Sequence, residues 1–313
     1  MEFSVERDTA RLHELATKQI YLGTSSWKYE GWLGQVYKGD YSSPRAAVNK
    51  KRFETECLEE FGHIFPTVCF DGGYWRFPEQ KQLEKYAGQL PDDFKMAIKV
   101  TNTITERRNR DGIANSGYLD ARAYIEHFLE PTRNALGAKL GPIILEFSPF
   151  FFGRGFGQLD YNPLQFVKDL HKFLAAIPKE GTMLAVEIRD PELLAFPRYL
   201  DCLEYHGVAH TLNEQTWMPD ISEQIDVPGV FTAPFTVIRA LVRPGVKHNE
   251  AVEEFSPYNR TQLELPLMRE GIAEAARRAM SSGRALYAYV NNRAEGNAPN
   301  TIAEVLELLF PEE

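Results

Sequence analysis

The sequence predicts an α/β fold, a single TIM-type (β/α)8 barrel of parallel strands with extended rim loops, and three observations favour it. Eight short apolar segments recur along the chain, and stretches with helical spacing separate them. The segments are almost continuously apolar, which is typical of parallel strands buried on both faces. An open doubly wound sheet uses the same alternation, but no G-x-G-x-x-G motif follows the first strand, which favours the barrel.

Each predicted strand ends in, or carries near its end, a few polar residues. Because the carboxyl ends of the strands line the active-site mouth of such a barrel, these residues are the first candidates for chemistry. In chain order the predicted strands cover residues 20–23, 67–70, 94–100, 143–145, 183–188, 208–212, 235–241 and 285–290.

Helical spacing and helix start signals predict a helix after each strand. The predicted helices cover residues 44–61, 78–90, 118–136 with an interruption at Pro131, 163–177, 191–205, 221–225, 263–280 and 298–309. A further short helix or arm precedes the first strand, so we divide the chain into an N-terminal arm or helix, 1–19, and a barrel domain, 20–313.

Composition is that of an ordinary globular protein, since 43% of the 313 residues are hydrophobic and 25% are charged. The net charge of −9 disfavours non-specific nucleic-acid binding. No secretory signal opens the chain and no apolar run is long enough to span a membrane. The three cysteines, Cys57, Cys69 and Cys202, are widely spaced and form no CxxC pair, which indicates buried thiols in a reducing compartment. We therefore expect a cytoplasmic protein with no membrane partner.

Six segments resemble, in the same order, those of the family called domain of unknown function 72, or YecE-like. Residues 23–27 (GTSSW) resemble its G-T-S-G-W, and residues 185–191 (AVEIRDP) resemble its A-V-E-x-R-x-P. The other matching segments are residues 65–78, 91–105, 136–147 and 285–292. The resemblance implies a TIM-type barrel and the place of a site, but the biochemical role of the family is unsettled.

The chain departs from the family pattern at several candidate positions. Cys69 stands where the family has glutamate, Asp71 where it has asparagine, and Glu106 where histidine is frequent. Arg239 is followed by Ala240 and Leu241, and the family's R-x-H-G is missing there. These differences indicate a divergent member, and loss of an ancestral activity is one interpretation of them.

Charged residues at the strand ends are the candidates for catalysis. Glu187 and Arg189 are two residues apart on one strand, so both point to the same side. There Arg189 would hold a substrate carboxylate or phosphate while Glu187 acts as acid or base; the alternative is a structural salt bridge. Lys99 is a candidate phosphate clamp or Schiff-base nucleophile, or the partner of a buried ion pair with Glu146 or Asp71.

The candidate site residues fall into two groups. The catalytic candidates are Glu187, Lys99 and Asp71. The substrate-binding candidates are Arg189, Arg239, Glu146, Asn291, Asn292, Trp27, Tyr74, Trp75 and Arg76. The aromatic residues after the first two strands suit stacking on a nucleobase or sugar, or else wedge the loops onto the barrel rim. The two asparagines would bind ligand or tie the last strand to the first.

No cofactor and no metal site are predicted. The seven histidines are scattered, and the one pair four residues apart, His206 and His210, straddles Gly207 at the start of a predicted strand; a hard-ion site made of Asp71, Glu146 and Glu187 is the alternative. Residues 153–157 lack the lysine and hydroxyl residue of a P-loop and are predicted to form a lid or rim loop. The arginines 107, 108 and 110 are predicted to form a solvated loop.

These observations lead to two hypotheses of different class. The first is a barrel enzyme acting on a small anionic, phosphate- or carboxylate-bearing substrate at the strand ends. The alternative is a protein that binds single-stranded nucleic acid or nucleotides without catalysis, through the aromatic loops. The partner is accordingly a small anionic ligand or, in the alternative, nucleic acid, and the sequence predicts no oligomeric state.

Overall fold

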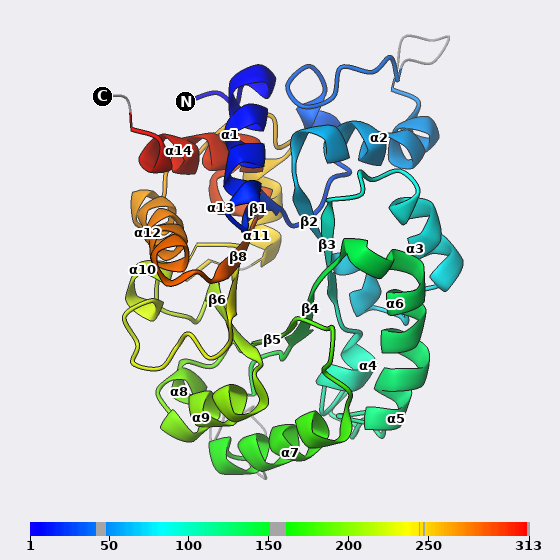
Figure 1. Cartoon of the computed structure of the whole chain (residues 1–313), viewed down its shortest axis with the longest axis vertical. Coiled ribbons are helices and arrows are strands. Elements are labelled where there is room, and N and C mark those ends of the chain that lie inside the picture. The colour runs from blue at the N-terminus through cyan, green and yellow to red at the C-terminus, as the bar shows by residue number, and fades with distance from the viewer. Residues whose placement is uncertain (42–47, 110, 151–160, 244, 247, 312–313) are drawn as a thin grey trace.

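Eight parallel strands form a closed barrel in the computed structural model, which describes residues 1–41, 48–109, 111–150, 161–243, 245–246 and 248–311 (Figure 1). The strands pair in chain order, and β8 closes the barrel by pairing with β1. Their bounds are β1 Ile20–Thr24, β2 Thr67–Phe70, β3 Lys95–Lys99, β4 Leu140–Glu146, β5 Leu184–Glu187, β6 Ala209–Glu214, β7 Phe235–Ala240 and β8 Ala285–Val290. The predicted fold class is confirmed, and every predicted strand is present.

Helices surround the barrel as an outer layer (Figure 1). The longer ones are α1 Val5–Thr17, α2 Lys50–Ile64, α3 Gln80–Ala87, α6 Glu130–Leu136, α7 Pro163–Ala176, α9 Pro197–His206, α11 His248–Phe255, α12 Pro266–Ser282 and α14 Ala298–Leu309. Single-turn helices are α4 Asn102–Thr105, α5 Ala121–Tyr124, α8 Pro191–Leu194, α10 Ile221–Gln224 and α13 Asn292–Glu295. Side chains buried between this layer and the barrel form one large apolar core.

The helical stretch that contains Pro131 runs on without a break. A π-helical turn, Ile125–Leu129, joins α5 to α6, and Pro131 lies in the first turn of α6. Since proline has no N–H and clashes with the carbonyl one turn earlier, a local widening of the helix accommodates it. The structure therefore differs from the interruption that the sequence predicts.

A second, separate cluster of buried side chains fills the barrel interior. Its members come from seven strands or their ends and include Cys69, Ala97, Ile144, Ala185 and Val237. Because side chains alternate across a strand, the residue two positions after each of these also faces inward. Those next inward positions are Asp71, Lys99, Glu146, Glu187 and Arg239.

Strand register places two carboxylates next to each other at the mouth, because Glu146 of β4 pairs with Glu187 of β5. Arg239 of β7 pairs with the uncharged Asn213 of β6. Two carboxylates directly opposite each other on adjacent strands destabilise a sheet unless cations lie between them. The closed barrel thus requires positive side chains at this level of its interior.

Candidate functional site

Arg239 lies at the centre of the barrel mouth and binds three carboxylates. Its side chain is 1% exposed. Its Nη1 donates to Glu187 Oε2 at 2.7 Å and to Glu146 Oε2 at 3.1 Å, and its Nη2 donates to both oxygens of Asp71 at 2.7 and 3.0 Å. Burial opposes the charge of Arg239, but Asp71 and Glu187 outweigh it and raise the pKa of the guanidinium well above its usual value. The arginine therefore stays charged and holds strands β2, β4, β5 and β7 together.

Glu146 is the carboxylate on which the cations of the mouth converge. It accepts from Arg189 Nη2 at 2.7 Å, from Arg239, and from Lys99 Nζ. Burial by itself would raise the pKa of Glu146, but Arg189, Lys99 and Arg239 lower it to about 2. Glu146 is therefore ionised at neutral pH and serves as a fixed negative charge that orients two cations toward the mouth.

Glu187 lies behind the two arginines and is fully buried. It accepts from Arg239 at 2.7 Å and from Arg189 Nε and Nη2 at 3.3 and 3.2 Å. Glu187 and Arg189 therefore form the ion pair that their spacing predicts. Arg189 faces the open cleft on its other side, while Glu187 is not part of the cleft wall.

The cleft above this network has a volume of about 580 Å³. Seven of the residues that line this cleft are site candidates predicted from the sequence: Asp71, Tyr74, Trp75, Lys99, Glu146, Arg189 and Arg239. Sequence reasoning missed five further lining residues: Ser148, Gln215, Leu241, Val242 and Arg293. All five follow strand ends within three residues. Extending the search for polar residues that far would have found Ser148, Gln215 and Arg293, whereas the apolar Leu241 and Val242 carry no such signal.

Cys69 and Asp71 occupy positions at which the family pattern differs. Burial raises the pKa of the Cys69 thiol, and its Sγ lies 3.7 Å from Asp71 Oδ1. A protonated, fully buried thiol is a poor nucleophile. Asp71 instead keeps 35% of its side chain exposed, which makes it the most accessible of the carboxylates bound to Arg239.

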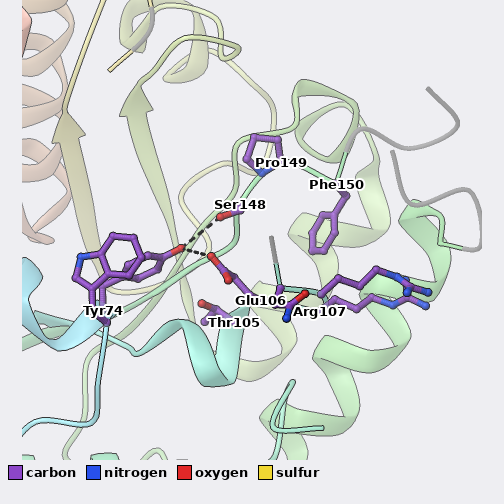
Figure 2. Close-up of a pocket in the computed structure, with 10 residues that line it drawn as sticks. Tyr74, Thr105, Glu106, Arg107, Ser148, Pro149 and Phe150 are labelled. Carbon is purple, nitrogen blue, oxygen red and sulfur yellow. Dashed lines mark hydrogen bonds between the residues drawn. The ribbon is translucent and has the colours of Figure 1, made fainter. Parts of the chain in front are cut away.

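Tyr74 lines both the first cleft and a second one of about 520 Å³, which Figure 2 shows. Its hydroxyl donates to Glu106 Oε1 at 2.8 Å and lies 3.3 Å from Ser148 Oγ. Lys99 Nζ lies 3.7 Å from the centre of its ring, a cation–π distance. Burial and the nearby Glu146 raise the pKa of Tyr74, so the phenol remains a hydrogen-bond donor. Glu106, a further departure from the family pattern, thus anchors Tyr74.

A glycine fixes the position of this tyrosine. Tyr74 ends the short 3-10 turn Asp71–Tyr74, and Gly73 precedes it. A Cβ on Gly73 would lie 2.9 Å from the carbonyl oxygen of Lys99, closer than real Cβ contacts. Glycine therefore lets the turn pack directly on β3, which brings the ring of Tyr74 over Lys99.

The second cleft is lined by a mixture of polar, basic and apolar groups. Tyr74, Trp75 and Ser148 belong to both clefts, so the two adjoin each other. Arg107 lies with its guanidinium carbon 4.3 Å from the ring centre of Tyr161. The other residues lining the second cleft are Thr105, Glu106, Arg108, Asn109, Pro149 and Phe150 (Figure 2).

The predicted aromatic cluster is divided between the cleft and the core. Trp75 is 66% exposed at the cleft rim. Trp27 is buried and packs against Phe70 and Tyr86, with ring centres 5.9 and 5.2 Å away. Arg76 points to solvent, 3.6 Å from Glu79. Trp27 and Arg76 do not line either cleft at the mouth.

The two asparagines after β8 make structural contacts. Asn291 Oδ1 accepts from the backbone N–H of Arg293 at 3.0 Å, and Asn292 Oδ1 accepts from that of Ala298 at 2.7 Å. Both side chains are buried and neither lines the cleft. Asn291 is thus the N-cap of α13, and Asn292 accepts the first N–H of α14, whose N-cap is Asn297. These bonds fix the turn that positions Arg293 at the cleft.

The hard-ion alternative would use the same three carboxylates that bind Arg239. The guanidinium lies between Asp71, Glu146 and Glu187, where a metal ion bound by all three would have to lie. In this arrangement the guanidinium neutralises the three carboxylates. The predicted rim loop at 153–157 and Arg110 fall outside the described residues.

Comparison with known proteins identifies the family and the fold. The model of the family described as "Protein of unknown function DUF72" matches residues 21–313. The chain is similar to a DUF72 family protein from Enterococcus faecalis V583, with 16% identity, a TM-score of 0.62, and coverage of 94% of this chain and 96% of the other. It is similar to a DUF72 family protein from Thermotoga maritima MSB8, with 17% identity, a TM-score of 0.60, and coverage of 94% and 100%. A search of curated proteins finds none that matches.

No helix in the described part of the chain has the length and apolar character needed to cross a membrane.

Proposed function

The chain belongs to the DUF72 family of proteins of unknown function, and we propose that it is a barrel enzyme acting on a small phosphate- or carboxylate-bearing substrate. The substrate binds in the cleft at the carboxyl ends of the strands. One observation carries the proposal: buried carboxylates hold Arg189 and Lys99 in fixed positions against an open cleft. Cations that are already oriented bind an anion without a further ordering cost.

Charge at the cleft favours an anion. Four lining residues are cationic, Lys99, Arg189, Arg239 and Arg293, and two are anionic, Asp71 and Glu146, which gives a balance of +2. Glu187, directly behind the wall, reduces it to +1. The cleft is thus positive although the whole chain carries a net charge of −9. A positive cleft in a negative protein attracts small anions and disfavours extended polyanions.

The structure suggests a division of roles among the charged groups. Arg189 presents a planar guanidinium, which matches the paired oxygens of carboxylate or phosphate, and Lys99 adds a point charge. Asp71 is the accessible carboxylate, so we assign acid/base chemistry to it. Glu187 holds Arg189 and Arg239 in place, and Glu146 orients Arg189 and Lys99.

Tyr74 and Trp75 provide the apolar part of the proposed substrate site. Their rings lie edge to face, with centres 5.0 Å apart, at the boundary of the two clefts. A flat or sugar-like part of the substrate can stack on Trp75 while its anionic group contacts Arg189. We therefore expect substrates that combine an anionic group with a ring.

Thermal unfolding in the presence of candidate ligands tests the binding step. A sugar phosphate or nucleotide at 100 times its Kd adds about 2.7 kcal/mol to stability by mass action. We expect one such compound to raise the Tm of the wild type and of Arg122→Ala, an exposed control that lines neither cleft. Arg189→Ala removes the proposed anion contact and should lose the shift relative to its own ligand-free Tm. A chelator in all samples keeps metal effects out of the comparison.

Turnover of the compound found in this way tests the catalytic step. Asp71→Asn should bind it nearly as well but lose about 10²–10⁴-fold in rate, the usual contribution of an acid/base group. If only oligonucleotides stabilise the protein, with a steep salt dependence, and Trp75→Ala abolishes that stabilisation, the enzyme proposal is wrong and the nucleic-acid alternative replaces it.

A further inference from the structure

Two helices on the outside of the barrel bring two histidines and a cysteine together. Helix α7 packs against α9, and the two lie side by side in Figure 1. Cys202 and His206 are four residues apart on α9, hence on one face of it, and His171 faces them from α7. His206 Nε2 lies 3.0 Å from His171 Nδ1. One ring nitrogen of each histidine and Cys202 Sγ all lie within 4.8 Å of one another.

We propose that His171, Cys202 and His206 form a binding site for a transition-metal ion of the Zn²⁺ class. Two imidazole nitrogens and a thiolate are donors that Zn²⁺ accepts, and hard ions such as Mg²⁺ and Ca²⁺ do not prefer them. Three protein ligands leave the fourth position of a tetrahedral ion open. The site shares no residue with the clefts at the barrel mouth.

Binding of Zn²⁺ would require only small movements of the three ligand atoms. Zn–N bonds of about 2.0–2.1 Å and Zn–S bonds of about 2.3 Å place tetrahedral ligand atoms about 3.3–3.7 Å apart. The two nitrogens, now at hydrogen-bond distance, would separate by a few tenths of an ångström, and the most distant pair would approach by about 1 Å. His171 is exposed, so its side chain is free of core packing that would oppose a movement of that size.

Burial changes the pKa of His206 and of Cys202 in opposite directions. Burial, followed by the charge of Lys179 and by His171, lowers the pKa of His206, which keeps this imidazole neutral. Burial raises the pKa of the Cys202 thiol to about 11, so the metal must displace its proton. We therefore expect about one proton to be released for each ion bound, and affinity to increase with pH.

The surroundings leave one side of the site open to solvent. Cys202 is 7% exposed, whereas Tyr205 is 78% exposed and lies against both imidazoles, with ring centres 5.7 Å from His171 and 5.0 Å from His206. Lys179 is the cation that faces the cluster, and its Nζ donates to the carbonyl of Leu174 at 2.5 Å. The fourth ligand is therefore water or a group from another molecule.

A metal at this position would join two consecutive barrel units. Helix α7 follows β4, which ends at Glu146, and α9 follows β5, which ends at Glu187. An ion linking the two helices would resist their separation without taking part in the chemistry at the mouth. We therefore expect it to raise thermal stability and to leave ligand binding at the cleft unchanged.

Titration of the full chain with Co²⁺, a spectroscopic substitute for Zn²⁺, tests the site. We expect one ion per chain, a sulfur-to-cobalt charge-transfer band, and release of about one proton per ion. Cys202→Ser should abolish the band, and Cys57→Ser, which removes another buried thiol, should retain it. His171→Ala should weaken binding by at least about tenfold, while the exposed control His127→Ala should not.

Clear results would overturn the proposal. Absence of a charge-transfer band at stoichiometric Co²⁺, or a band that persists in Cys202→Ser, shows that the thiol is not a ligand. Equal affinity of wild type and His171→Ala shows that the imidazoles do not bind the ion. Because His171 is exposed, the His171→Ala variant should fold. Its affinity for Co²⁺ therefore tests the metal site even if Cys202→Ser unfolds.

Discussion

Glu146 and Glu214 lie at the carboxyl ends of two strands and are both 2% exposed, yet their ionisation differs. Burial raises the pKa of Glu214 to about 8, and its main partner is the backbone N–H of Ile221, which donates to Oε2 at 3.0 Å. Glu146 faces the barrel interior, where three cations surround it and lower its pKa to about 2. At pH 7 Glu146 is therefore ionised and Glu214 is protonated although both are buried, because cations surround Glu146 at the mouth, whereas Glu214 accepts from the uncharged N–H of Ile221. The negative charge of Glu146 therefore depends on the cations that the barrel mouth places around it.

Arg239→Leu should have the largest effect, since it removes the cation shared by three carboxylates. Leaving buried charges without a partner costs about 3–5 kcal/mol of unfolding free energy. Urea denaturation at pH 7 measures the loss. A loss below about 1 kcal/mol would mean that Lys99 and Arg189 alone neutralise the carboxylates, and the central role of Arg239 would be refuted.

Acid should remove the stabilisation that Glu146 contributes. Its folded pKa of about 2 is below the ordinary value of 4.5, so its contribution is complete above that value and is lost as pH falls toward 2. The difference is on the order of 3 kcal/mol. Unfolding free energies of wild type and Glu146→Gln between pH 5 and 2 should therefore converge as pH falls. If the two plots of unfolding free energy against pH stayed parallel, the pKa of Glu146 would not be lowered in the folded protein.

Glu214 should show the opposite pH dependence. Its folded pKa is raised, so the protein is destabilised as pH rises from about 5 through 8 and the buried carboxyl must ionise. Glu214→Gln keeps an oxygen to accept from Ile221 and should be more stable than wild type at pH 9 by on the order of 5 kcal/mol, the cost of ionising a carboxyl whose pKa is raised from 4.5 to about 8. Equal stability at pH 5 serves as the internal control.

Tyr74→Phe should have the smallest effect on stability. The hydroxyl binds Glu106, a partly exposed carboxylate that water can solvate in the variant. We expect a loss of about 0.5–1 kcal/mol, and a pH profile between 5 and 2 that is unchanged from wild type. A changed profile would show that Tyr74 contributes to the ionisation of Glu146, which would extend the charge network to the second cleft.

The strand positions and the mouth could be predicted from the sequence because both depend on short-range periodicity. A period of two residues places Asp71, Lys99, Glu146, Glu187 and Arg239 inward, each two positions after an interior side chain. The same rule places Glu187 and Arg189 together.

Most contacts between distant elements depend on the closed fold and could not be predicted; for Lys99 the sequence left Glu146 and Asp71 as alternative partners, and the structure pairs it with Glu146. The aromatic residues after β1 and β2 look alike in sequence, but packing of the helices buries Trp27 and leaves Trp75 at the cleft. The spacing of Cys202 and His206 is visible in the chain, whereas His171 joins them only because α7 packs on α9.

The sequence by itself determined the barrel, the order of its strands and the level at which charges face inward, since local alternation and apolar runs encode these. Only the tertiary structure decided which cation binds which carboxylate, and why two equally buried glutamates differ in charge. The physical reason is that electrostatic energy depends on separations of a few ångströms between groups far apart in sequence, and barrel closure alone sets those separations.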